Sequence, residues 1–154
     1  MISLLYIPIT SSEVDVYVKN TPLSIKTVTV KNNGKWTPIK LIWTVDRDKA
    51  IEFKETYKPW CDMLVAKICW NKTGSLLLFS KETQQQVLQQ IGSDRYITLP
   101  KEGTNSRGVV ISAEALSLIE KSPDTRSIDI NFIQGDIDYR EVYTKWLDAW
   151  VEDY

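Results

Sequence analysis

The residue types best suited to chemistry lie in two neighbouring strand-like segments near the N-terminus. The first segment, residues 13–18, carries Asp15, and the second, residues 23–28, carries Ser24 and Lys26. Side chains alternate along a strand, so Ser24 and Lys26 share one face. If the two segments form an antiparallel hairpin, a carboxylate, a hydroxyl and an ammonium meet on one side of a sheet.

The register of this hairpin decides which side chains face each other. The sequence predicts a four-residue turn at residues 19–22, with Val18 paired to Leu23. In that register Asp15 lies directly opposite Lys26. A carboxylate in this place can hold a hard divalent cation, and the lysine then lies beside a water that attacks phosphorus. The alternative is a cross-strand ion pair on a solvated sheet face, which contributes little stability.

The composition excludes other kinds of catalytic site. The 154 residues contain no histidine, which removes Ser-His-Asp and Cys-His catalysis and histidine-bound zinc. Cys61 and Cys69 match neither a CxxC redox motif nor a four-ligand zinc site, and we expect two buried thiols in a reducing compartment. Residues 1–10 are apolar but too short to span a membrane and lack a basic leader, so we expect a cytoplasmic protein with no membrane partner.

Charge is unevenly distributed along the chain. The net charge is −1, yet residues 16–45 contain no acidic residue and carry five lysines: Lys19, Lys26, Lys31, Lys35 and Lys40. This stretch is therefore +5 and the remaining residues total −6. A basic strand system of this kind is typical of a surface that binds phosphates. The alternative is a solvated, lysine-rich hairpin.

Hydrophobic periodicity and turn signals predict one α/β or α+β domain over residues 1–154, with a central mixed β-sheet flanked by helices. Turns are expected at Asn32–Gly34 and at Gly74, and Asp46 and Ser80 are expected to cap helices. Helices are expected at residues 46–58, 80–91, 112–121 and 139–152. Strands are expected at residues 3–8, 13–18, 23–30, 36–45, 62–70, 76–79, 96–99, 109–111 and 127–132.

The order of these elements resembles the PD-(D/E)XK nuclease superfamily, and within it a type II restriction endonuclease. The residues that carry the resemblance are Asp15, Ser24-Ile25-Lys26, the helix at 46–57 and the segment 61–65 that follows it, together with restriction-enzyme-like sequence at 22–27 and 103–108. The resemblance implies a restriction-endonuclease-like core at residues 3–70. Residues 71–154 would then supply DNA-recognition and packing elements.

The resemblance also implies the role of each site residue. Asp15 and the backbone carbonyl of Ile25 would bind Mg²⁺, with Mn²⁺ as a substitute. Lys26 would orient or deprotonate the attacking water and stabilise charge at phosphorus. The substrate would be double-stranded DNA, cut by a homodimer, and a cognate DNA methyltransferase would act in the same restriction-modification system.

Two features depart from the family pattern. Ser24 stands where the family usually has Asp or Glu, and a hydroxyl is a poorer metal ligand than a carboxylate. The family core usually begins with a helix, whereas this chain opens on strand-like sequence, as an N-terminally shortened relative would. Glu13 lies on the face of Asp15 and can supply another carboxylate, although an inert, exposed glutamate is favoured. Asp62 can complete a metal site, although a solvated strand start is favoured.

Several residues are candidates for contact with DNA. Lys31, Lys35 and Lys40 would contact phosphates. In the loop 101–108, Asn105 can read adenine and Arg107 can read guanine; the alternative is a turn whose polar groups bond to local backbone.

Two further patterns favour structural roles. Gln84, Gln85, Gln86, Gln89 and Gln90 are expected on a solvated helix face rather than on bases. Tyr139, Tyr143, Trp146 and Trp150 form one aromatic helix face, for core packing or for a dimer interface.

Three functions remain open on these observations. The first is a Mg²⁺-dependent DNA endonuclease of the type II restriction kind, in which Asp15, Ser24 and Lys26 form the catalytic site. The second is a catalytically inactive DNA-binding or protein-binding domain on a shortened nuclease scaffold. The third is a small acidic interaction protein with no role on nucleic acid.

Overall fold

A five-stranded mixed sheet forms the larger layer of the computed structural model, which describes residues 13–30, 34–101, 108–133, 135 and 144. Its strand order is β1-β2-β4-β5-β8, and only the pairing of β2 with β4 is parallel within that order. The strands are β1 (Val16–Val18), β2 (Thr21–Thr29), β4 (Asp62–Ile68), β5 (Lys72–Phe79) and β8 (Arg126–Phe132). The predicted mixed sheet is thus confirmed.

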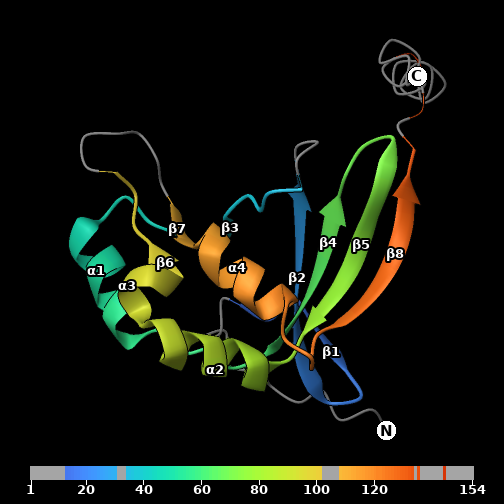
Figure 1. Ribbon diagram of the computed structural model, residues 1–154. Coiled ribbons are helices and arrows are strands. Elements are labelled where there is room, and N and C mark those ends of the chain that lie inside the picture. The colour runs from blue at the N-terminus through green and yellow to red at the C-terminus, as the bar shows by residue number, and fades with distance from the viewer. Residues whose placement is uncertain (1–12, 31–33, 102–107, 134, 136–143, 145–154) are drawn as a thin grey trace, which may run out of the picture.

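A second, three-stranded sheet has the order β3-β7-β6 and is antiparallel throughout. It contains β3 (Ile39–Trp43), β6 (Ile97–Thr98) and β7 (Gly108–Ile111). The sequence predicted these strands but did not separate them from the main sheet. In Figure 1 this small sheet lies with α1 and α3 on one side of the molecule, and the long strands β4, β5 and β8 lie on the other.

The helices begin where the sequence places a capping side chain. Asp46 accepts the backbone N–H groups of Asp48 and Lys49, and Ser80 and Ser112 each accept one N–H in the first turn of the helix that follows. The helices are α1 (Arg47–Thr56), α2 (Lys81–Ile91), α3 (Ser93–Tyr96) and α4 (Ala113–Glu120). None of the helices in these described residues is long and apolar enough to cross a membrane.

The core lies between the helices and one face of the main sheet (Figure 1). Val65, Phe79, Val109, Leu116 and Ile119 have no exposed surface, so β4, β5, β7 and α4 all contribute to it. Burying one such side chain contributes roughly 1.5–3 kcal/mol. The core therefore fixes β4 against β2, the strand that carries Ser24 and Lys26.

Two local predictions were wrong. Gly74 lies inside β5, paired with Ile130, and the chain turns instead at Asn71, whose φ is 58°. A glycine is required there because a Cβ at Gly74 would lie 2.7 Å from the Phe132 ring. The strand expected at 96–99 is β6, which is shortened by the helical turn α3. Predictions for residues 3–8, 31–33 and 139–152 fall outside the described part of the chain.

Candidate active site

The hairpin that carries the site is joined by a two-residue turn, not the predicted four-residue one. Lys19 and Asn20 have φ values of 48° and 68°, and two positive φ values in succession are typical of a type I′ turn. Val16 pairs with Leu23 and Val18 pairs with Thr21. The predicted register was therefore wrong by two residues, and Asp15 does not lie directly opposite Lys26. An even shift keeps each side chain on its own face, so Asp15 and Lys26 still meet.

Asp15 immediately precedes Val16, the first paired residue of β1, and its carboxylate lies at the edge of β2. Its Oδ2 atom accepts three hydrogen bonds: from the Ile25 N–H at 2.6 Å, the Ser24 hydroxyl at 3.2 Å and the Lys26 ammonium at 3.5 Å. Its own N–H donates to the Leu23 carbonyl at 3.0 Å. The structure thus brings Asp15, Ser24, Ile25 and Lys26 into contact.

The donors around Asp15 favour its ionised form. Burial raises the pKa of Asp15, but the Ile25 N–H, the charge of Lys26 and the Ser24 hydroxyl together outweigh burial. The net result is a pKa below the ordinary value, so the group is a carboxylate at neutral pH. The Lys26–Asp15 ion pair is unequal in exposure, with 22% of the Lys26 side chain and 44% of the Asp15 side chain exposed.

Glu13 is the residue that sequence reasoning missed, since it was expected to be exposed and inert. It is half-buried, and its Oε1 atom is inaccessible and has no hydrogen-bond partner in the described residues. Burial raises the pKa of Glu13, although a hydrogen bond with Tyr57 and the charge of Lys26 lower it in part. One feature of the sequence did point to Glu13: it lies two residues before Asp15, and residues two apart in a strand share one face.

Comparison with known proteins agrees with this arrangement. The family model described as restriction endonuclease ThaI matches residues 4–152. The chain belongs to the ThaI restriction endonuclease family. A solved structure described as a restriction endonuclease in complex with substrate DNA has a TM-score of 0.84 and 41% sequence identity to this chain. The match covers 96% of this chain and 69% of the solved one. A search of curated proteins found no match.

Membership of the ThaI family confirms the predicted resemblance to a restriction endonuclease and the predicted fold. At Ser24, where the chain departs from the superfamily pattern, the structure shows the contacts of the serine. In this ThaI-family chain the Ser24 side chain is 1% exposed, and its hydroxyl donates to Asp15. Ser24 therefore supports the Asp15 carboxylate within the site.

The site of this ThaI-family chain fits a hard divalent cation. Its donors are oxygens, and the buried, unpartnered Oε1 of Glu13 is an atom that a cation would satisfy. In a strand the N–H and C=O of one residue point to the same edge, so the Ile25 carbonyl faces the side on which Asp15 lies. Within the described residues, no group of three or more His, Cys, Asp or Glu side chains forms a metal site. Mg²⁺ needs only one or two carboxylates when substrate phosphates complete its coordination.

Of the three lysines predicted to contact DNA, the structure describes Lys35 and Lys40. Lys40, on β3, places its Nζ 3.2 Å from the centre of the Trp43 ring, and Trp43 is 70% exposed. Lys35 is exposed and lines a hollow of about 420 Å³ beside Glu114 and Glu120 of α4. Lys31, Asn105 and Arg107 fall outside the described residues.

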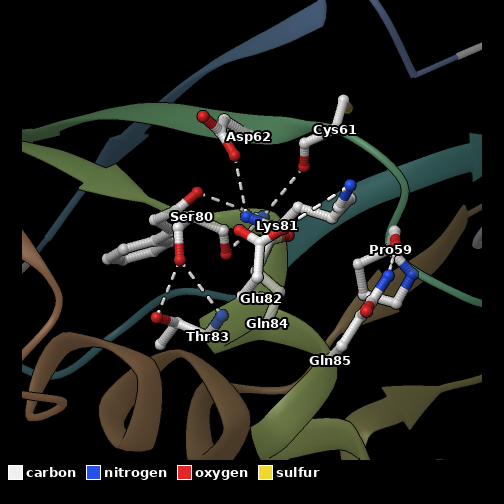
Figure 2. Close-up of polar contacts among 10 residues, drawn as sticks. Pro59, Cys61, Asp62, Ser80, Lys81, Glu82, Thr83, Gln84 and Gln85 are labelled. Carbon is white, nitrogen blue, oxygen red and sulfur yellow. Dashed lines mark hydrogen bonds and ion pairs between the residues drawn. The ribbon is translucent and has the colours of Figure 1, made fainter.

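The glutamine run has a structural role at its first two positions, contrary to the predicted solvated face. Gln84 is 1% exposed, and its Nε2 donates to the carbonyls of Cys61, Phe79 and Ser80 (Figure 2). Gln85 donates to the Pro59 carbonyl. These bonds attach α2 to the ends of β4 and β5, so Gln84 is not free to contact bases.

Asp62 also has a structural role, in agreement with the favoured interpretation. Its Oδ1 accepts the Lys81 N–H at 2.8 Å, at the first turn of α2 (Figure 2). The bond satisfies one of the helix N–H groups that have no partner within the helix. Asp62 is thereby assigned to helix capping. The two cysteines are free and buried, as predicted.

Proposed function

We propose that this chain is a Mg²⁺-dependent endonuclease of the type II restriction kind, which hydrolyses phosphodiester bonds in double-stranded DNA. One observation carries the proposal: the Asp15 carboxylate, the Ser24 hydroxyl, the Ile25 backbone and the Lys26 ammonium converge at one edge of β2. A carboxylate with a lysine in contact is the chemistry that phosphodiester hydrolysis needs. The solved relative is described as bound to its substrate DNA, which supports DNA as the substrate.

Each residue has a distinct role in this proposal. Asp15 and the Ile25 carbonyl would hold the cation, and Ser24 helps to fix the Asp15 carboxylate through its hydrogen bond. The Lys26 ammonium lies 3.5 Å from Asp15, where it would orient the attacking water and stabilise negative charge at the phosphoryl oxygens. When bound, Mg²⁺ supplies Lewis-acid polarisation of the phosphate and neutralises developing charge.

DNA binding is assigned to Lys31, Lys35 and Lys40 for phosphates and to Asn105 and Arg107 for bases. A homodimer would let two such sites cut both strands of a symmetric target. A cognate DNA methyltransferase would protect the host sequence. The division into a core at residues 3–70 and recognition elements at residues 71–154 belongs to the same proposal.

The test is cleavage of supercoiled plasmid by the purified chain with Mg²⁺ or Mn²⁺, with and without EDTA. We expect nicked and linear products with either metal, none in EDTA, and none with Asp15→Asn. Cleavage that persists in EDTA would contradict the proposal.

The second candidate function is a binding domain without catalysis, and the serine at the position of the motif acid favours it. Retarded migration of DNA without any cleavage, at every metal tested, would establish that alternative.

A further inference from the structure

The Glu13 side chain contains a buried polar atom that no contact of the described residues satisfies. Its Oε1 atom is removed from water and has no hydrogen-bond partner among them. A buried carboxylate oxygen without a partner is costly, and such atoms are normally satisfied by a hydrogen bond, a water or a cation. This unsatisfied oxygen belongs to a residue two positions before Asp15 that Lys26 influences electrostatically, so it points to a ligand shared with the candidate active site.

In the described residues, one carboxylate oxygen of Glu13 has a hydrogen-bond partner and the other, Oε1, has none. The Tyr57 hydroxyl bonds to Glu13, and because Oε1 has no partner this bond is made to the other oxygen. The Lys26 ammonium is close enough to act electrostatically on both Glu13 and Asp15. The two carboxylates thus approach the same ammonium.

A second polar group in this region also has no partner. Tyr96 is completely buried, its hydroxyl has no hydrogen-bond partner in the described part of the chain, and it interacts electrostatically with Glu13. The Tyr57 and Tyr96 rings lie 6.1 Å apart, centre to centre. Two buried polar atoms without partners thus lie in one electrostatically coupled group, and a hydrated cation would offer a partner to each.

Ser24 cannot provide the second carboxylate that a divalent cation would use here. Its hydroxyl is buried and donates to Asp15 Oδ2, the oxygen that also accepts the Ile25 N–H and the Lys26 ammonium. Ser24 adds no negative charge, so Asp15 alone would face a divalent ion. Glu13 is a second carboxylate on which Lys26 acts electrostatically.

We infer that Glu13 is the second carboxylate ligand of the divalent cation, and that it replaces the acid absent at Ser24. The inference rests on the proposed function of this site. Glu13 Oε1 and the Asp15 carboxylate bind the ion together, while Tyr57 orients Glu13 through its other oxygen. Two carboxylates with water and phosphate oxygens make up a ligand set that suits Mg²⁺ and Mn²⁺.

The experiment is a calorimetric titration of the full chain with Mn²⁺ in the absence of DNA, on wild type, Glu13→Gln, Asp15→Asn and Ser24→Ala. Glu52→Gln, on the exposed face of α1, is the matched control for loss of a carboxylate. We expect Glu13→Gln and Asp15→Asn each to weaken Mn²⁺ binding by at least about tenfold, the order that even supporting residues of metal sites show. Ser24→Ala should weaken binding less, and Glu52→Gln should leave it unchanged.

A thermal-shift measurement with added Mn²⁺ keeps the test independent of catalysis. Mn²⁺ should raise the melting temperature of wild type and not that of Glu13→Gln, because a ligand stabilises only the state that binds it. If Glu13→Gln does not fold, Glu13→Asp retains the charge at a shorter reach and should bind Mn²⁺ more weakly than wild type.

Binding of Mn²⁺ by Glu13→Gln as by wild type, with loss in Asp15→Asn, would overturn the inference and leave the proposed function standing. Absence of any Mn²⁺ site in wild type would overturn both.

Discussion

The Asp15 carboxylate accepts the backbone N–H of Ile25 at 2.6 Å and so takes the place of a strand partner just before β1 begins. Because β1 begins only at Val16, no strand of the described residues pairs with β2 beside Ile25, and a side chain accepts its N–H instead. This bond fixes Asp15 against the strand that carries Lys26.

Lys26→Met should abolish metal-dependent cleavage and leave DNA binding intact. The lost Lys26–Asp15 ion pair is partly exposed, so the free energy of unfolding should fall by no more than about 1 kcal/mol. Plasmid cleavage and a DNA gel-shift assay measure the two effects. Lys67→Met is the control: Lys67 pairs with Glu120 at 2.7 Å and lies 4.4 Å from the Trp36 ring, so it should lose stability but still cut. Equal loss of cleavage in both variants would contradict the role of Lys26.

Glu13→Gln should stabilise the metal-free protein at neutral pH and have little effect at pH 4. The folded-state pKa of Glu13 is raised, mainly by burial, so the folded chain binds more protons than the unfolded chain above the unfolded pKa of about 4.3. The free energy of unfolding of the wild type therefore falls as pH rises above the unfolded pKa of Glu13. Glu13→Gln has no ionisable group at this position and should not show that fall. Urea denaturation in EDTA from pH 4 to pH 8 measures it. Parallel pH curves for the two proteins would show that Glu13 is solvated.

Replacing Lys31, Lys35 and Lys40 together with Gln should flatten the salt dependence of DNA binding. Each lysine on a phosphate contributes about 0.9 to the slope of log K against log salt, so the slope should fall by up to roughly three. Affinity titrations at four salt concentrations measure it. An unchanged slope would mean that these lysines are solvated, with Lys40 held on Trp43 for structural reasons.

Gln84→Ala should destabilise the fold by about 1–3 kcal/mol, because three buried carbonyls lose their shared donor. Gln86→Ala, on the exposed side of the same helix, should change stability by less than about 0.5 kcal/mol. Guanidinium denaturation of both variants gives the comparison. Equal effects would show that the position of Gln84 on α2 is unimportant.

Gly74→Ala should be more damaging than its size suggests. The new Cβ would collide with the Lys67 carbonyl of β4 and lie 2.7 Å from the Phe132 ring of β8. Strand β5 must therefore shift against both neighbours, at a cost of roughly 1–3 kcal/mol. Gly135→Ala is the control, because a Cβ there meets nothing within 4 Å. Thermal melts of the two variants should differ by several degrees; coincident melts would contradict the close approach at Gly74.

The sequence by itself determined the features that depend on neighbouring residues. The caps at Asp46 and Ser80 were predicted because a capping side chain bonds to N–H groups two or three residues away. The shared face of Ser24 and Lys26 follows from the two-residue period of a strand, and it survived an error of two residues in the register. The type of fold and the group around Asp15 were therefore within reach of sequence reasoning.

Only the tertiary structure decided the features that depend on contacts between distant segments. Glu13 is half-buried and hydrogen-bonds to Tyr57 at the end of α1, and no local pattern encodes that contact. Gln84 faces inward because the ends of β4 and β5 present carbonyls that need a donor. Strand β3 belongs to the second sheet through its pairing with β7, which lies more than sixty residues later in the chain. Periodicity specifies which side of an element is apolar, whereas packing decides what covers that side.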